Sequence, residues 1–480
     1  MRVHRATRFE WMLIGAALAL APAQAAAQTL ARPLPGLPST LARPIPARSG
    51  ASTRDATQAA APGGVRHRRG WGRVAVHTNA WRFDAEGRDT STLNEVITSA
   101  SYRVVDREDD GVEFGVDVRH SGFTAGERPS RVSIYEGFVG ARLRDGALNV
   151  RAGHLWLNDL GSLGAVAGAQ IEVGQRATGT TRWGRLRAGL FGGGEPRLYR
   201  AGYESNIRKL GGYALLHDGG SRRHVVGLVQ VRNGSLTERS VLVTTNAFPI
   251  GSKAFVYQAA EYDLERPAGE ADPGLTYAFG TLRVSPSRRL DLQATVSRGR
   301  SVDVRGLGQD VLAGRPVAQR NVEGLRYQSV GGRATVEVLT GIRAYAGYTR
   351  DTDNRGEPAT HRWLFGGYAA DVLRTGLDLT ASDSMNRRPS GTSHARYLSV
   401  GRSFGRRAYV TMDYSTSLVV LSFTRNDGLL IESRPRTRRI GASTVVTLTR
   451  AVSLLATVDR TTDGSVRDLR LTTGLTYRLR

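Results

Sequence analysis

The sequence has no cysteine, only 4 methionines and, beyond its first residues, no long apolar run. Without cysteine there can be no disulfide framework, no thiolate metal ligand and no cysteine nucleophile. A membrane helix needs about 20 mainly apolar residues, so a helical membrane protein is excluded. Glycine is abundant instead, at 57 of 480 residues, together with Thr, Val, Tyr and Arg. This composition suits strands better than packed helices.

Acidic residues are also scarce relative to basic ones, 43 against 67, and the formal charge is +24. Such an excess can indicate nucleic-acid binding. Here, however, the arginines are spread along the whole chain and alternate with apolar residues inside expected strands. We therefore expect no nucleic-acid partner and assign the charge to arginines that face water.

The first 27 residues have the three parts of a secretory signal peptide. Arg2, Arg5 and Arg8 precede an apolar core at 11–21, and Ala25 and Ala27 form an A-x-A cleavage motif. The apolar core is too short to span a bilayer, which favours removal over anchoring. The alternative is a short helix of a soluble protein. We predict a signal peptide at 1–27.

Residues 28–70 are rich in Pro, Ala, Ser and Arg and cannot bury enough apolar surface to fold. We predict a disordered periplasmic tail there, followed by a barrel at 71–480. Transporters driven from the inner membrane need a folded plug before the barrel, and this tail is too short and too polar to form one. No plug domain is expected.

Beyond residue 70 apolar and polar residues alternate with a period of two. Clear examples occupy 112–119, 290–297, 377–382 and 469–479. A soluble sandwich also alternates in this way. Tight turns at 107–110, 145–147, 286–288, 339–342, 374–376, 406–407 and 451–452 nevertheless alternate with longer loops at 122–130, 267–274, 304–324, 353–360 and 388–393. This parity is typical of outer-membrane barrels. We predict an all-β transmembrane antiparallel barrel of about 22 strands, with 18 or 20 as alternatives because 199–218 could hold one strand or two.

The C-terminus ends in a glycine followed by spaced aromatic and apolar residues: Gly474, Tyr477 and Leu479. This pattern resembles the sorting signal of bacterial outer-membrane proteins, although Arg480 replaces the usual final aromatic residue. The resemblance implies the barrel-assembly machinery as a partner and the bacterial outer membrane as the location. An even strand number would put both termini in the periplasm. The sequence does not indicate the oligomeric state.

Charged residues on the polar parity of the strands are candidates for lining a pore. The basic candidates are Arg119, Arg151, Arg185, Arg187 and Arg333, and the acidic ones are Glu113, Asp117 and Glu337. Opposed basic and acidic walls would set a transverse field, and the excess of arginine would favour anions. The alternative is structural, with neighbouring charges pairing across strands and stiffening the wall.

A glycine-rich segment at 158–167 is expected to join strands five and six as the third outer loop. Its position and glycine content resemble the third loop of general bacterial porins, which folds into the barrel and narrows it. That resemblance implies a constriction built from Asn158, Asp159, Gly161 and Gly164. The alternative is a surface loop of small residues.

No motif in the sequence supports catalysis or metal binding. The segment 351–356 resembles a calcium loop of the D-x-D-x-D-G type, but Arg355 occupies a ligand position and its charge opposes a cation. The nine histidines show no HExxH or HxH spacing. We expect no enzyme, no cofactor and no metal.

Two functions fit these features. The first is an outer-membrane channel for passive diffusion of small solutes, with a lean toward anions. The second is a structural or export-associated barrel gated by partner proteins. A folded periplasmic adaptor would favour the second, and none is found in the sequence. The expected partners are outer-membrane lipid, the barrel-assembly machinery and small solutes.

Overall fold

A computed structural model describes residues 70–479, apart from gaps at 87–88, 105–109, 124–127, 176–183, 198–200, 219, 266–273, most of 302–323, 390, 425–429 and 465. The expected signal peptide at 1–27 and nearly all of the expected tail at 28–70 lie outside the described residues. The prediction that this N-terminal segment forms no plug concerns the same residues and is therefore not tested by the structure. The described residues contain no helix of the length and hydrophobicity needed to cross a bilayer.

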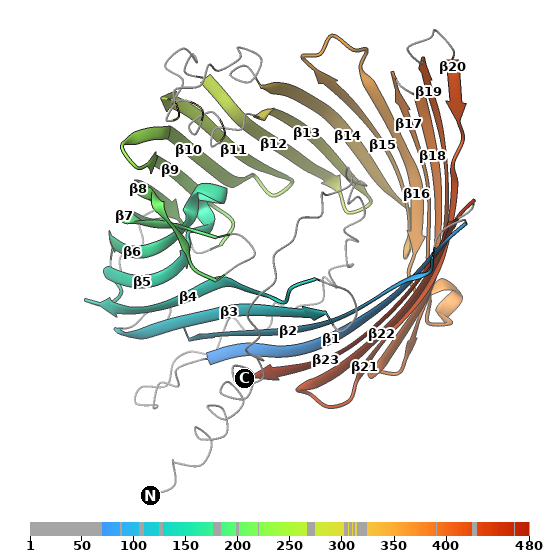
Figure 1. Cartoon of the computed structure of the whole chain (residues 1–480), viewed down its shortest axis with the longest axis horizontal. Coiled ribbons are helices and arrows are strands. Elements are labelled where there is room, and N and C mark those ends of the chain that lie inside the picture. Colours follow the sequence, from blue (N-terminus) through green and yellow to red (C-terminus); the bar gives the residue numbers. More distant parts are fainter. Residues whose placement is uncertain are drawn as a thin grey trace, which may run out of the picture. The chain divides into compact units, whose positions relative to one another are not determined.

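The described chain is built almost entirely of strands (Figure 1). The strands are β1 (Gly70–Ala85), β2 (Ser91–Val104), β3 (Gly111–Phe123), β4 (Arg131–Leu143), β5 (Leu148–Trp156), β6 (Ala165–Gly174), β7 (Arg185–Pro196), β8 (Tyr203–His217), β9 (Arg223–Asn233), β10 (Leu236–Ile250), β11 (Ala254–Glu265), β12 (Gly274–Ser287), β13 (Leu290–Ser301), β14 (Leu325–Leu339), β15 (Ile342–Asp353), β16 (Thr360–Ala369), β17 (Leu377–Arg388), β18 (Gly391–Phe404), β19 (Ala408–Thr424), β20 (Leu430–Ser433), β21 (Arg436–Thr447), β22 (Val452–Asp463) and β23 (Val466–Leu479). Two short 3-10 helices, η1 (Asn158–Gly164) and η2 (Val372–Arg374), interrupt them.

Successive strands pair antiparallel, and the last pairs with the first. β23 lies against β1 over the register Gly72↔Leu479 to Ala85↔Val466, so the sheet closes on itself. Closure leaves no unpaired strand edge, which a sheet in lipid requires. The prediction of a closed antiparallel barrel is confirmed.

The barrel has 22 strands although 23 are labelled, because β20 and β21 occupy one position. Both pair with β19, and they are separated only by Arg434 and Pro435. Proline has no N–H to donate to a ladder. Its carbonyl still accepts a hydrogen bond from the Val419 N–H at 3.0 Å, so the strand continues through the break. The expected number of about 22 is confirmed, and the ambiguous stretch 199–218 contains one strand, β8.

The connections follow the expected parity. The described strands that flank the predicted tight turns meet those turns at one end of the barrel, and the strands that flank the predicted longer loops meet them at the other end. Lengths are less regular than expected: the connection 234–235 on the long-loop side and the loop predicted at 388–393 both reduce to two residues between strands. Two-residue hairpins are the tightest antiparallel connection, and here they occur on the side of the longer loops. The order of the strands therefore decides at which end of the barrel a connection lies, whatever its length.

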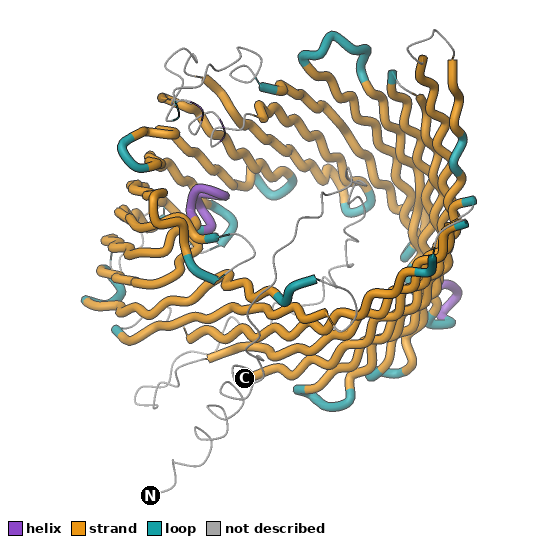
Figure 2. Tube along the Cα trace, viewed as in Figure 1, coloured by secondary structure: helices purple, strands orange, loops and turns teal. Residues whose placement is uncertain are grey.

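The two faces of the wall can be followed through the strand register. η1 lies inside the ring of strands (Figure 2) and touches β9 and β10, which defines the lumen side. Continuing the register from these strands to β23 places Arg470, Thr472 and Arg478 on the lumen side. Leu471 and Leu475 face outward and are 48% exposed, as expected for side chains that contact lipid.

A charge at an outward position should therefore destabilise the barrel, whereas the same charge on its lumen neighbour should not. We expect Leu475→Arg to lower the free energy of unfolding by about 2–4 kcal/mol, the cost of a cation in the middle of the membrane. Thr476→Arg, one residue along β23, should change it by less than about 1 kcal/mol. Denaturant titration of the barrel folded in lipid vesicles measures both. The opposite order of the two variants would mean that the faces are assigned the wrong way round.

Candidate constriction and lumen wall

η1 is the third connection on the long-loop side and folds inward as a compact turn. The Leu157 N–H donates to the Gly164 carbonyl at 3.0 Å, and the Leu160 N–H donates to the Leu157 carbonyl at 3.0 Å, which closes the segment at its base. Two glycines make this possible. Gly161 has φ +59°, and a Cβ on Gly164 would stand 2.1 Å from the Leu157 carbonyl oxygen. Both positions therefore require glycine.

Leucines of η1 pack onto the lumen face of the wall. Leu160 is fully buried, and its side chain lies over Gly227 of β9, where a Cβ would come within 2.7 Å. The buried cluster formed by this contact comprises Phe138, Leu155, Leu157, Leu160, Leu163, Val166, Phe191, Ile207, Tyr213, Leu215, Val225, Val229, Val231, Val241 and Val243. Burying one leucine contributes about 1.5–3 kcal/mol, so the docked position of η1 is strongly favoured over a free loop.

The lumen face of β9 and β10 is apolar beside η1. Val229 and Val241 are fully buried there, although outward neighbours such as Leu228 are apolar too. A strand that is apolar on both faces is buried on both faces. Here lipid would contact one face and η1 covers the other. This group of residues was not predicted from the sequence, although the uninterrupted apolar run 225–229 indicates a strand that is buried on both faces.

Two polar contacts tether η1 to the same strands. The Asp159 carboxylate pairs with the Arg223 guanidinium at the start of β9. The Thr245 hydroxyl of β10 donates to the Asp159 carbonyl at 3.3 Å. Asp159 therefore belongs to the tether, and its charge is matched by Arg223.

Removing the charge of Asp159 should loosen η1 without unfolding the barrel. The pair is half exposed, so its loss should cost about 1 kcal/mol, a fivefold increase in the opening of the segment. We expect Asp159→Asn to speed amide hydrogen exchange at Leu160 by about fivefold. Asp353→Asn is the matched control, because Asp353 pairs with Arg355 at the tip of an outer loop, far along the chain from η1. Equal exchange in both variants would show that the carboxylate does not hold η1.

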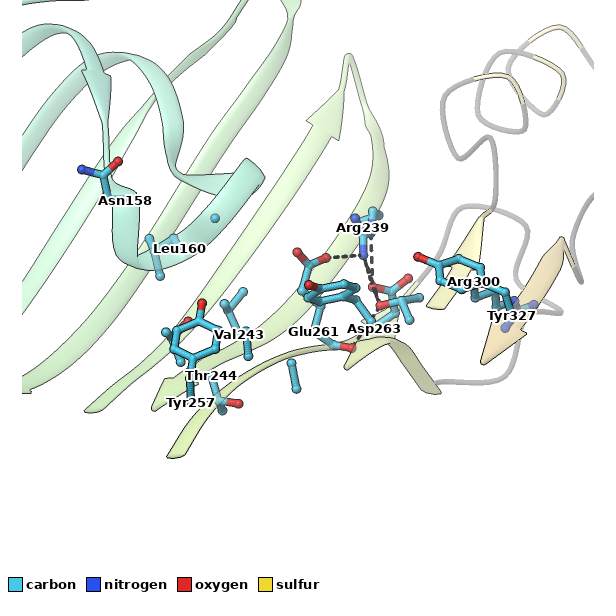
Figure 3. Close-up of a pocket in the computed structure, with 16 residues that line it drawn as sticks. Asn158, Leu160, Arg239, Val243, Thr244, Tyr257, Glu261, Asp263, Arg300 and Tyr327 are labelled. Carbon is cyan, nitrogen blue, oxygen red and sulfur yellow. Dashed lines mark hydrogen bonds and ion pairs between the residues drawn. The ribbon is translucent and has the colours of Figure 1, made fainter. Parts of the chain in front are cut away.

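Beside η1 the lumen wall forms a recess of about 450 Å³, lined by η1, β10, β11 and β12 with residues of β13 and β14 (Figure 3). Arg239 is at its centre. The guanidinium Nη2 lies 2.6 Å from Oδ1 of Asp263 and 3.3 Å from Oε2 of Glu261. Three tyrosines, Tyr257, Tyr277 and Tyr327, also line the recess. The charges of Arg239, Glu261 and Asp263 thus neutralise each other in part, and the recess combines this ion cluster with aromatic rings.

Farther round the wall, several predicted pore-lining charges are paired with each other. Glu113 is 1% exposed and lies between Arg151 and Arg142, with the Arg142 Nε 3.3 Å from Oε2 of the carboxylate. Arg187 pairs with Glu172 at 2.7 Å. Tyr213 donates to the other oxygen of Glu172 at 2.6 Å. The partners Arg142, Glu172 and Tyr213 were not predicted, because the residue opposite a given side chain depends on a register that alternation does not fix.

The remaining predicted charges are more accessible. Glu337 and Arg343 form an exposed pair at 3.4 Å. Asp117 lies across from Glu136, whose carboxylate binds Arg103. Arg119, Arg185 and Arg333 have no carboxylate partner in the part of the chain that the structure describes, and Arg333 lies 4.0 Å from the centre of the Tyr345 ring. The structure thus separates the predicted arginines into a paired group and an accessible group.

Two further predicted segments have clear positions. Of the sorting-signal residues on β23, Gly474 faces the lumen against His77, and Tyr477 faces outward. In the calcium-like segment, Asp351 pairs with Arg362 and Asp353 pairs with Arg355. The two carboxylates that could bind a cation are therefore bound to guanidinium groups. Among the described residues, no group of His, Asp and Glu is arranged to hold a metal ion.

Comparison with known proteins shows the fold. No protein-family model and no curated protein matches the chain. Among solved structures, the ferric enterobactin receptor PfeA of Pseudomonas aeruginosa is 10% identical with a TM-score of 0.51, over 84% of this chain and 81% of that one. OccAB4 of Acinetobacter baumannii is 9% identical (TM-score 0.42; 85% and 98% covered), and the P pilus usher PapC translocation pore is 11% identical (TM-score 0.45; 85% and 99% covered). The likeness to PfeA shows that the chain has the fold of a closed antiparallel β-barrel.

Proposed function

We propose that the protein is an outer-membrane channel for passive diffusion of small solutes, with no turnover chemistry. The observation that carries the proposal is η1, docked on the lumen wall of a closed 22-strand barrel by Leu160. A segment buried in this way narrows the lumen at a fixed place and leaves the wall intact. The width beside η1 then selects solutes by size.

We further propose that the channel leans toward anions. Arg119, Arg185 and Arg333 project from lumen positions without a carboxylate partner among the described residues, whereas Glu113, Glu172 and Asp263 are each paired with an arginine. Paired charges contribute little to the field that an ion meets, so the accessible arginines set its sign. Salt screens such charges, and the preference should be modest.

Planar-bilayer recording under a salt gradient tests this proposal. The reversal potential should lie on the anion side and shrink as ionic strength rises. Replacing Arg119, Arg185 and Arg333 with Gln, the lumen triple variant, should bring the anion-to-cation permeability ratio close to about 1 while changing conductance little. Cation preference in the unmodified protein would contradict the anion lean. A barrel that never conducts would favour a partner-gated export or structural role instead.

The proposal includes a route to the membrane. The signal peptide at 1–27 would be removed, the tail at 28–70 would lie in the periplasm without forming a plug, and the barrel-assembly machinery would recognise Gly474, Tyr477 and Leu479. The lumen-facing glycine at 474 and the outward aromatic residue at 477 support this reading of β23. Membrane fractionation combined with N-terminal sequencing tests it, and a cytoplasmic protein that retains Met1 would refute it.

A further inference from the structure

The outward face of β21, β22, β23 and β1 changes from apolar to basic near the long-loop end of the strands. Neighbouring residues of the four strands form one row across the wall: Arg438, Thr462, Arg467 and Asp84. The next row toward the tight turns contains Ile440, Arg460, Leu469 and Arg82. These two rows, here called the basic rim, carry four arginines and one carboxylate within about 15 Å, since adjacent strands lie about 4.8 Å apart.

Below the basic rim the outward face carries no charge. On β23 the outward residues below Leu469 are Leu471, Thr473, Leu475, Tyr477 and Leu479, and on β1 they continue from Ala80 to Gly72. Ten residues of a strand tilted by about 40° rise about 25 Å, the height of the apolar band of an outer-membrane barrel. The basic rim therefore lies where the apolar band ends and lipid headgroups begin, on the side of the longer loops.

The arginines of the rim are available to a ligand. Arg82 pairs with Asp84 at 3.3 Å on an exposed surface. Arg438, Arg460 and Arg467 are exposed and form no salt bridge among the residues described, although the Asp84 carboxylate lies beside Arg467. The four arginines of the rim outnumber its single carboxylate, so their guanidinium groups repel each other, and a polyanion placed between them would relieve that repulsion.

We propose that the basic rim binds a phosphate-bearing lipid of the outer leaflet. Guanidinium groups match phosphate with two parallel hydrogen bonds, and Thr462 between them adds a hydroxyl. The apolar outward residues directly below, such as Val458 and Leu471, would contact its acyl chains. A lipid with two phosphates fits the spread of the three arginines better than one with a single phosphate. This inference is independent of transport, because the rim and the lumen are on opposite faces of the wall.

Native mass spectrometry of the full barrel in detergent tests the proposal, with bisphosphorylated lipid A as the probe. The reference probe is the same lipid after enzymatic dephosphorylation, which keeps the acyl chains. The barrel should retain the phosphorylated lipid more strongly. The rim triple variant (Arg438→Gln, Arg460→Gln and Arg467→Gln) should weaken this retention by on the order of 100-fold, about fivefold for each arginine at an anionic surface.

The lumen triple variant is the matched control, because it removes the same charge from the other face. It should retain the phosphorylated lipid as the unmodified barrel does, while the rim triple variant should keep the unmodified reversal potential. Resistance to unfolding in SDS verifies that both variants are folded. Equal retention of the two lipids by the unmodified barrel would overturn the proposal, and so would equal losses in the two triple variants.

Discussion

Excision of η1 should raise the single-channel conductance by more than about twofold, because the width of a barrel this large is limited by what folds into it. The variant replaces residues 157–164 with Asn-Gly. This two-residue turn would join the paired residues Trp156 and Ala165 directly in a type I′ hairpin. Single-channel recording in planar bilayers measures the change. An unchanged conductance would place the narrowest point elsewhere and would contradict the proposed role of η1.

A second variant separates the effect of width from that of the shortened chain. Leu160→Ala keeps every residue of the segment but removes the side chain that is buried over Gly227. Losing a buried leucine typically costs about 2–5 kcal/mol, enough to let η1 leave the wall. We expect fluctuating conductance between the unmodified level and the level of the excised variant. Leu163→Met, a nearly volume-conserving change in the same cluster, should leave the conductance at its original value.

The fold could be predicted from the sequence because a barrel repeats one simple rule. Every strand must present apolar side chains to lipid, so alternation persists from 112–119 to 469–479 and can be recognised without knowing which strands are neighbours. Closure through β1 and β23 followed from the requirement that no edge stays open. Loop lengths such as 389–390 were not predictable, because a connection can shorten without altering the parity of the strands.

The lumen wall was predictable only in part. The alternation of apolar and polar residues identified Glu113 and Arg151 as facing the lumen. It could not show that Arg142 completes their cluster, because that depends on the register of β3 against β4. The site on β8–β10 was missed for a different reason. In a membrane barrel the apolar side chains are expected to face lipid, whereas here they face the lumen. Such a conflict between local pattern and global fold commonly marks a functional element.

Loss of the Glu113 carboxylate should strongly destabilise the barrel. Glu113 is almost completely buried between Arg151 and Arg142, and both guanidinium groups are themselves largely buried. Glu113→Gln would leave the Arg151 and Arg142 guanidinium groups next to each other without the carboxylate that now lies between them. Breaking a buried pair in this way costs about 3–5 kcal/mol. Glu337→Gln is the control, because its exposed pair with Arg343 should contribute only about 0–1 kcal/mol.

A double substitution shows whether Glu113→Gln lowers the free energy of unfolding through repulsion between the two arginines or through altered packing at position 113. Arg151→Met removes one of the two neighbouring guanidinium groups, and its side chain can still cover Phe138, over which the guanidinium now lies at 5.2 Å. The combination of Glu113→Gln with Arg151→Met should therefore be more stable than Glu113→Gln alone by at least about 1 kcal/mol, a coupling typical of contacting charges. Denaturant unfolding in lipid vesicles gives both values. If the two substitutions destabilised the barrel additively, the carboxylate would matter for packing and not for charge, and the wall around β3–β5 would not depend on ion pairing for its stability.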